Sequence, residues 1–313
     1  MTGFLDSLMA VGTQVVVLFV LIGVGAVTRF TKILNDESVR GCTSLLLTFV
    51  TACLLIASFQ RECTPEQLGM VGTSAVIGFV FHGISIALAY LFLHDADKSR
   101  DAVLKFSVVF TNAGFMSIPL QEAVLGADGV FCGAVIVGIF QLLCWTFGLW
   151  LMSGDRRILS LRKVVVNPGI IGIATALALF LLGVKLPEVV LSPCRHMGNL
   201  NTPLAMIVIG YHLAGARFGG ILHDAKGLFA MALRLVVSPL LLVLLMRLCG
   251  VGNHTVLVAT VIAASAPVAA ITTMFSVQYG RDVRLSVELV SLSTLVSVVT
   301  MPLVVALAEV FVP

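Results

Sequence analysis

Two short stretches of this 313-residue chain hold polar and helix-breaking residues whose spacing suits a binding site. They are Asn112, Gly114 and Pro119 in one stretch, and Ser265, Ala266 and Pro267 in the other. Each proline lies inside an apolar run, where it removes a backbone N–H and interrupts a helix. The helical residues after such an interruption expose free N–H groups and a partial positive charge, which suits a carboxylate or another anion. Asn112 adds an amide that donates and accepts hydrogen bonds, and Gly114 lets the backbone approach a ligand closely.

The elements that must position these residues are membrane helices. Apolar residues make up 59% of the chain and charged residues only 11%, with a mean hydropathy of +1.09. A soluble chain carries about 25% charged residues. The apolar runs are long and continuous, whereas the strands of a membrane β-barrel alternate in polarity. The first residues lack the basic start of a cleaved signal peptide. We therefore predict an all-α polytopic membrane protein with ten transmembrane helices, over residues 9–30, 41–59, 69–93, 103–124, 130–151, 167–184, 197–215, 226–249, 254–279 and 285–310.

The basic residues predict the orientation of these helices, because Lys and Arg are enriched in cytoplasmic links. If the amino terminus lies outside, 14 of the 19 Lys and Arg residues fall in inside links and four in outside links, while Arg234 lies within a helix. This predicts that both termini lie outside. The size of the chain, without a long central loop, indicates the plasma membrane of a prokaryote.

Ten helices divide into two sets of five, and an odd number in each set inverts the second set relative to the first. We predict an inverted repeat over residues 1–151 and 167–313, joined by a cytoplasmic linker at 152–166. The two interrupted helices are then the fourth of each half, helices 4 and 9. Matched breaks in the halves of an inverted repeat are typical of the binding site of a secondary transporter. No P-loop is present, so ATP-driven transport by this chain alone is not predicted.

The stretch FTNAGFMSIPL (110–120) resembles the helix-4 signature of the auxin efflux carrier family, in the superfamily of bile acid/Na⁺ symporters. Similar stretches continue along nearly the whole chain, among them NPGIIGI (167–173), GNLNTPLAMIVIG (198–210), LRLVVSPLL (233–241) and APVAAITTMFSVQYGRD (266–282). The resemblance implies crossed broken helices, a scaffold part and a transport part, and elevator-like alternating access. It also implies organic anions as substrates, commonly carboxylates, and a homodimer, as in plant members of the family.

Helices 2 and 7 are expected to contribute to the substrate pocket. The resemblance implies lining by Thr51, Thr202, Pro203 and Met206. Thr51 occupies a position at which the family often has proline, so the geometry of helix 2 is left open. No two His or Cys residues have the spacing of metal ligands, and none of the seven cysteines forms a CxxC pair, so we predict no metal site or cofactor.

Four further polar residues lie within the predicted helices, Glu288 near an inner end, and ionisable groups inside a membrane are costly and need a partner. We predict that Arg234 in helix 8 and Glu288 in helix 10 approach each other or share a polar network. The repeat maps helices 8 and 10 onto helices 3 and 5, which contain His82 and Gln141. The resemblance implies a polar support site between helices 3 and 5. Histidine titrates near neutral pH, so proton coupling and a purely structural role both stay open for His82.

These features predict a secondary transporter of small organic anions, with carboxylates as the leading class. Membrane potential, H⁺ and Na⁺ all stay open as the driving force. One alternative is Na⁺-coupled symport of the bile acid type, but no Asp or Glu lies beside either break to ligate the cation. Another is a receptor that does not transport, which would have no need of two matched breaks. An enzyme is not predicted, because HExxH is absent and every Asp lies in a link or at a helix end. The expected partners are the anion and the lipid bilayer, and no nucleic acid.

Overall fold

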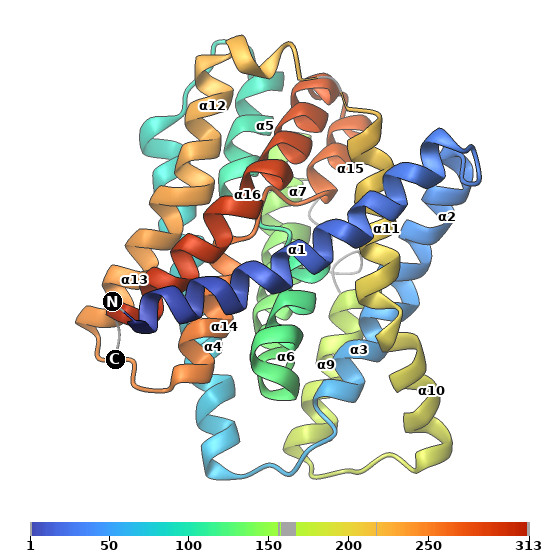
Figure 1. Ribbon diagram of the computed structural model, residues 1–313, viewed down its shortest axis with the longest axis vertical. Coiled ribbons are helices and arrows are strands. Elements are labelled where there is room, and N and C mark those ends of the chain that lie inside the picture. Colours follow the sequence, from blue (N-terminus) through green and yellow to red (C-terminus); the bar gives the residue numbers. More distant parts are fainter. Residues whose placement is uncertain (1, 156, 158–166, 217, 312–313) are drawn as a thin grey trace.

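The computed structural model describes residues 2–155, 157, 167–216 and 218–311, and within them the chain is built from helices (Figure 1). The first part contains α1 (Thr2–Phe30), α2 (Asp36–Leu45), α3 (Thr51–Ser58), α4 (Pro65–Phe92), α5 (Lys98–Val109), α6 (Ile118–Leu143) and α7 (Leu149–Ser153). The second contains α9 (Pro168–Leu181), α10 (Glu188–Asn199), α11 (Asn201–Ala214), η5 (Ile221–His223), α12 (Ala225–Ala232), α13 (Ser238–Leu248), α14 (His254–Ser265), α15 (Ile271–Gln278) and α16 (Val283–Phe311). The all-α prediction is confirmed for this part of the chain. The expected linker at 152–166 lies largely outside the described residues.

The starts of these helices are encoded locally. A polar side chain just before the first turn accepts a hydrogen bond from a backbone N–H of that turn, which caps a helix. Such caps begin α2, α4, α5, α9 and α14, and the capping residues are Asn35, Thr64, Asp97, Asn167 and Asn253. Pro65 and Pro168 occupy the first position of α4 and α9, where proline costs no hydrogen bond.

Four π-helical turns occur among the described residues, and each continues directly into the α-helix that follows it. They are η1 (Leu46–Val50), η2 (Ala113–Ser117), η3 (Cys144–Gly148) and η6 (Leu233–Val237). Turns η2 and η6 end just before Pro119 and Pro239, whose missing N–H groups disturb the preceding turn. Single π turns inside helices are frequent at functional sites.

Six helical rods are long and apolar enough to cross a membrane. They are Leu8–Phe30, Asp36–Ser58, Pro65–Phe92, Ala113–Ser153, Ala225–Leu248 and Val283–Phe311. Two shorter apolar helices, α9 and α14, accompany them. The spans expected over 103–124 and 254–279 are each interrupted, between α5 and α6 and between α14 and α15, whereas the span expected over 197–215 corresponds mostly to α11.

The helical stretch Ala113–Ser153 covers the second half of the span expected over 103–124 and all of the span expected over 130–151. It consists of two helices on either side of a non-helical residue, as the sequence separates them. The chain turns between them at Gly126, whose φ of 63° is a conformation that favours glycine.

The helices pack in two groups (Figure 1). The α3 group consists of α2, α3, α9, α10 and α11, in which α3 packs against α9 and α10. The crossover group consists of α4, α5, α6, α7 and α12–α16, in which α14 packs against α6 and α16. Helix α1 contacts both, through α11 on one side and α16 on the other. Gly210 allows the contact with α11, because a Cβ there would collide with the backbone carbonyl of Ile22. Glycine permits this close helix approach in membrane proteins.

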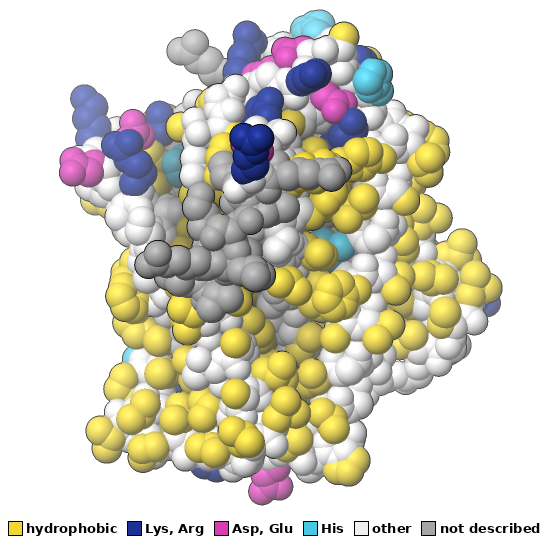
Figure 2. Space-filling view, turned by 180° about the vertical axis from the view of Figure 1, so that it is seen from behind, with side chains coloured by type: hydrophobic (Ala, Val, Ile, Leu, Met, Phe, Trp, Pro, Cys, Tyr) yellow, Lys and Arg dark blue, Asp and Glu magenta, His cyan; other side chains and the backbone are white. Residues whose placement is uncertain are grey.

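The outer surface is that of a membrane protein. Hydrophobic side chains cover much of the face in Figure 2, and most of the charged side chains visible there gather at the end where α5 and α12 begin. Large apolar side chains such as Leu91, Leu182 and Val189 are more than three-quarters exposed. An apolar surface of this extent marks a protein that contacts lipid rather than water.

Candidate functional site

The two interrupted helices meet at their breaks, as the resemblance implied. Helix α5 ends at Val109 and α14 ends at Ser265, and the extended residues that follow form an antiparallel bridge between Thr111 and Val268. The Asn112 N–H donates to the Pro267 carbonyl at 2.8 Å, and the Ala269 N–H donates to the Phe110 carbonyl at 3.0 Å. We call residues 110–112 and 266–270 the crossover.

The two prolines lie in different places relative to the crossover. Pro267 lies in the crossover, and its carbonyl accepts from Asn112. Pro119 lies at the start of α6, one π turn beyond the crossover, and is absent from the bridge hydrogen bonds of the described residues. Because proline has no N–H, Pro119 leaves a carbonyl of the preceding turn without its helical donor.

Asn201 supplies a replacement donor to a carbonyl of this turn. The sequence alone did not point to this residue. The Asn201 side-chain amide is 2% exposed and donates to the Gly114 carbonyl at 3.2 Å. In a regular or π-helical turn this carbonyl would accept from residue 118 or 119, and residue 119 is proline. The sequence feature that could have identified Asn201 is an asparagine directly before Thr202 and Pro203, inside an apolar helix.

The start of the second part of the broken helix offers free donors. Among the residues that the structure describes, the N–H groups of Ala113, Gly114 and Phe115 have no acceptor. Asn112 is 5% exposed, and its side-chain amide neither caps the turn that follows nor has another partner in the described chain. A Cβ at half-buried Gly114 would meet no atom within 4 Å, so there is room beside this backbone. The arrangement can bind a small acceptor group such as a carboxylate.

The other predicted residues of the second break, Ser265 and Ala266, do not face an open space in this conformation. Ser265 and Ala266 are fully buried, and the Ser265 hydroxyl donates to the Ile262 carbonyl of its own helix at 3.1 Å. Ser293 of α16, which the sequence analysis did not select, accepts from the Val268 N–H at 3.1 Å. A buried serine in an apolar helix is too common to be a signal by itself.

Helix 2 is distorted at Thr51 even though the expected proline is absent. Both the N–H and the hydroxyl of Thr51 donate to the Leu46 carbonyl, the hydroxyl at 2.9 Å, and the π turn η1 lies between them. Of the predicted residues of helix 7, Thr202 is half-buried and Pro203 is exposed, while Met206 is fully buried in the core. The structure therefore places these four residues in different environments.

Arg234 and Glu288 do not hydrogen-bond or form an ion pair with each other in the described chain, and each has other partners. Glu288 pairs with Arg284 one turn earlier on α16, with Oε1 and Nε 3.1 Å apart. Arg234 is 0% exposed, and its guanidinium donates to the carbonyls of Val108 and Ala264. The sequence pattern pointed to a carboxylate because an ion pair is the usual partner at depth.

His82 and Gln141 are both buried but do not hydrogen-bond each other within the described chain. The His82 Nδ1 lies 2.8 Å from the Gly78 carbonyl of its own helix, which makes Nδ1 the donor. The Gln141 side chain accepts from the Trp145 indole N–H at 3.1 Å, and it lies against Gly169 at the start of α9. The expected support site between helices 3 and 5 is therefore not formed by direct contact of these two side chains.

A cavity of about 320 Å³ opens between α3, α6 and α10, at the boundary of the two helix groups. Its lining includes Arg61, which pairs with Asp128 at 2.6 Å. The cavity reaches Leu54 and Asn199, which lie three residues from Thr51 and Thr202 respectively. Three residues are about one helical turn, so the cavity ends close to the predicted pocket residues of helices 2 and 7.

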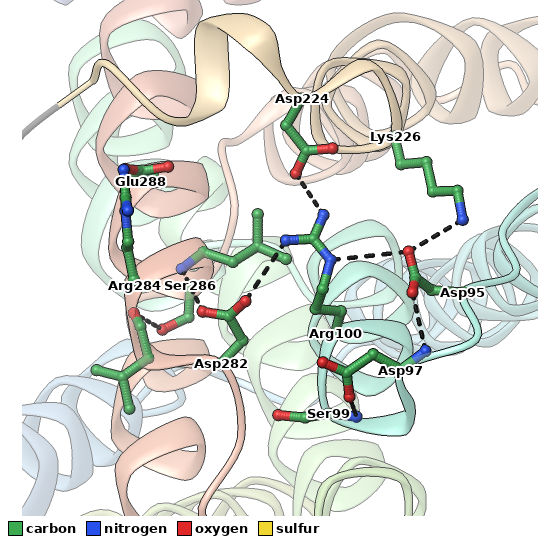
Figure 3. Close-up of polar contacts among 12 residues, drawn as sticks. Asp95, Asp97, Ser99, Arg100, Asp224, Lys226, Asp282, Arg284, Ser286 and Glu288 are labelled. Atoms are coloured by element: carbon green, nitrogen blue, oxygen red, sulfur yellow. Dashed lines mark hydrogen bonds and ion pairs between the residues drawn. The ribbon is translucent and has the colours of Figure 1, made fainter.

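The opposite end of the molecule is held by a charge network (Figure 3). Arg100 reaches three carboxylates, those of Asp224 at 2.7 Å, Asp282 at 3.5 Å and Asp95 at 3.7 Å. Lys226 also pairs with Asp95, at 3.0 Å. The hydrogen bond from Lys226 is the main cause that lowers the pKa of the Asp95 carboxyl from its ordinary value. These residues lie at the ends of helices in the crossover group, so the network ties that group together.

Comparison with known proteins agrees with this architecture. The family described as "Membrane transport protein" matches residues 10–160 and 155–305. A protein named as an uncharacterized transporter from Methanocaldococcus jannaschii is 23% identical over 92% of this chain and 96% of its own length. Another so named, from Methanothermobacter thermautotrophicus, is 23% identical over 91% of this chain and 94% of its own. The chain therefore belongs to the membrane transport protein family, which is the auxin efflux carrier family that its sequence resembles.

Proposed function

We propose that this protein is a secondary transporter of small organic anions, above all carboxylates, and that the substrate binds at the crossover. The observation that carries the proposal is the combination, in the described chain, of three N–H groups without acceptors, the unpartnered Asn112 amide and the open space beside Gly114. The N-terminal end of a helix favours negative charge through its dipole as well as its N–H groups. Family membership supports transport, and the chemistry of the crossover supports an anion.

We infer that the finer architecture is ten transmembrane helices in two inverted repeats, 1–151 and 167–313. The two breaks support this inference, because each half supplies one broken helix and the two cross in antiparallel fashion. The basic links support a cytoplasmic location for residues 152–166 and outside termini in a prokaryotic inner membrane.

An elevator-like mechanism is supported by the division into two helix groups. The crossover group would carry the substrate past the α3 group, to which it is joined at the site by the bond from Asn201 to Gly114. The cavity beside Arg61 would be the entry path on the side predicted to be outside. We further propose coupling to H⁺ or Na⁺ and assembly as a homodimer, both on the family resemblance.

The test is a thermal-shift panel on purified protein, with mono- and dicarboxylates, indole acids, bile acids and neutral isosteres, each with and without Na⁺. A ligand at 100 times its Kd stabilises the folded state by about 2.7 kcal/mol. One acid class is expected to raise the melting temperature, and its amide isostere is not.

Two matched asparagine variants make the panel sharper. Asn112→Ala is expected to change stability by less than about 0.5 kcal/mol, because the amide has no partner, yet to lose the acid effect. Asn35→Ala removes the cap of α2 and is expected to cost about 1 kcal/mol while the acid effect remains. If Asn112→Ala keeps the full acid effect, or if Na⁺ alone stabilises the protein, the proposed anion site is wrong.

For the acid found, uptake into proteoliposomes decides transport and its driving force. Uptake is measured in three separate experiments, one with an imposed membrane potential, one with a pH gradient and one with a Na⁺ gradient. Absence of uptake under all three, in vesicles where the protein binds the acid, would favour a receptor over a transporter.

A further inference from the structure

Arg234 makes an unusual pair of contacts. It lies in the π turn η6, it is 0% exposed, and its guanidinium carbon lies 5.0 Å from the centre of the Phe81 ring. Its Nη1 donates to the Val108 carbonyl at 3.0 Å, and its Nη2 donates to the Ala264 carbonyl. Val108 is in the last turn of α5 and Ala264 is in the last turn of α14. One side chain therefore binds the carboxyl ends of both interrupted helices.

These two carbonyls are among those that the breaks leave without helical donors. In an uninterrupted helix the Val108 carbonyl would accept from the Asn112 N–H, and the Ala264 carbonyl from the Val268 N–H. The Asn112 N–H donates instead to Pro267 across the crossover, and the Val268 N–H donates to Ser293. The two terminal nitrogens of the Arg234 guanidinium take the place of both lost N–H donors.

The charge of Arg234 is balanced by helix ends rather than by an acid. Within the described part of the chain, no carboxylate lies within ion-pair distance of its guanidinium. Helices α5 and α14 each have 12 residues, and the carboxyl end of a helix carries about half a negative charge. Two such ends together match one guanidinium.

We propose that Arg234 is the positioning residue of the crossover. It fastens the carboxyl ends of α5 and α14 to each other, and it neutralises their partial negative charge so that the crossover favours an anion. The fastening is independent of the substrate, whereas the preference for an anion rests on the proposed function.

The two roles respond differently to substitution. Lysine keeps the positive charge, but its single ammonium lacks the planar fork that reaches two carbonyls in fixed geometry. Methionine keeps much of the length and removes both the charge and the donors. Arg247 supplies a matched control, because it lies in the last turn of α13, which continues from the π turn of Arg234, and is exposed.

The experiment compares the wild type with Arg234→Lys, Arg234→Met and Arg247→Met. Hydrogen exchange in peptides over residues 106–118 and 262–272 reports the bridge, and thermal shift reports the preference for the stabilising acid over its neutral amide. Since a hydrogen bond to a charged group is worth about 1.5–3 kcal/mol, exchange at the bridge is expected to rise about tenfold or more in Arg234→Met. A smaller rise is expected in Arg234→Lys and none in Arg247→Met.

The acid-over-amide preference is expected to fall about tenfold in Arg234→Met and to persist in Arg234→Lys. A purely structural arginine would raise exchange in both variants without changing that preference, which would overturn the electrostatic role. Bridge exchange equal to that of Arg247→Met would overturn the fastening role. If Arg234→Met does not fold, the same comparison is made with Arg234→Lys, where unchanged exchange overturns the fastening. If the wild type binds no acid, the proposed function and the anion preference both fail, and the exchange data alone decide the fastening.

Discussion

Replacing Asn201 by alanine is expected to loosen the start of α6 at the crossover. The amide of this side chain is the donor to the Gly114 carbonyl at 3.2 Å, and the side chain is 2% exposed. Alanine removes the donor and leaves the carbonyl with Pro119 one turn ahead, which has no N–H to replace it. The change therefore removes a bond without supplying another partner.

The size of the effect can be worked from burial. A buried hydrogen bond contributes about 1 kcal/mol, and a carbonyl left without a donor costs about 1–3 kcal/mol. Gly114 is only half-buried, so water can reach part of the site and the lower end of this range applies. A loss of about 1–2 kcal/mol corresponds to a melting temperature about 2–3 °C lower for a chain of this length.

The assay is thermal unfolding in detergent, together with titration of the acid that stabilises the wild type. Binding is expected to weaken about fivefold or more, because the Gly114 backbone forms part of the site. Leu200→Ala is the control, since Leu200 is the preceding residue and is 41% exposed. If Asn201→Ala unfolds and binds the acid as Leu200→Ala does, the tether from α11 to the crossover is not formed.

Three further outcomes are expected. Gly210→Val should lower stability by about 1–3 kcal/mol, seen as a lower melting temperature, because the added side chain collides with the backbone of α1. Gly114→Val should change stability by less than about 1 kcal/mol but abolish acid binding in the thermal-shift assay, because the side chain fills the open space beside the crossover. For Asp95, whose folded pKa is lowered mainly by the hydrogen bond from Lys226, the stabilising contribution is present above the unfolded pKa and is lost as pH falls through the folded one. The melting temperature of the wild type should therefore fall between about pH 5 and pH 3, and more steeply than that of Lys226→Met.

For each of these three predictions, a specific result would contradict it. Gly12→Val on α1 is the control for Gly210, because a Cβ at Gly12 meets open space, and equal stability of the two variants would exclude the close helix contact. Acid binding that survives in Gly114→Val would place the ligand elsewhere. Identical acid-side slopes in the wild type and Lys226→Met would show that the pair with Asp95 contributes nothing.

Some of the candidate site could be predicted from local sequence. Pro267, Asn112 and Gly114 stand out because proline and glycine change backbone conformation wherever they occur, and an amide inside an apolar run is unusual. The distortion at Thr51 could not be predicted in the same way. Its cause is a side-chain hydrogen bond to Leu46, which a sequence pattern does not distinguish from an ordinary threonine in a helix.

The amino-acid sequence by itself determined the membrane class, the all-helical character and the positions of both breaks, because hydropathy and backbone preference act over a few neighbouring residues. Only the tertiary structure decided which groups meet at the breaks. The carbonyls that Arg234 binds lie 126 and 30 residues away along the chain, and the donor to Gly114 lies 87 residues away. Such partners follow from how helices pack. The two terminal nitrogens of buried Arg234 donate to carbonyl oxygens of helix ends, in place of the carboxylate that its charge alone suggested.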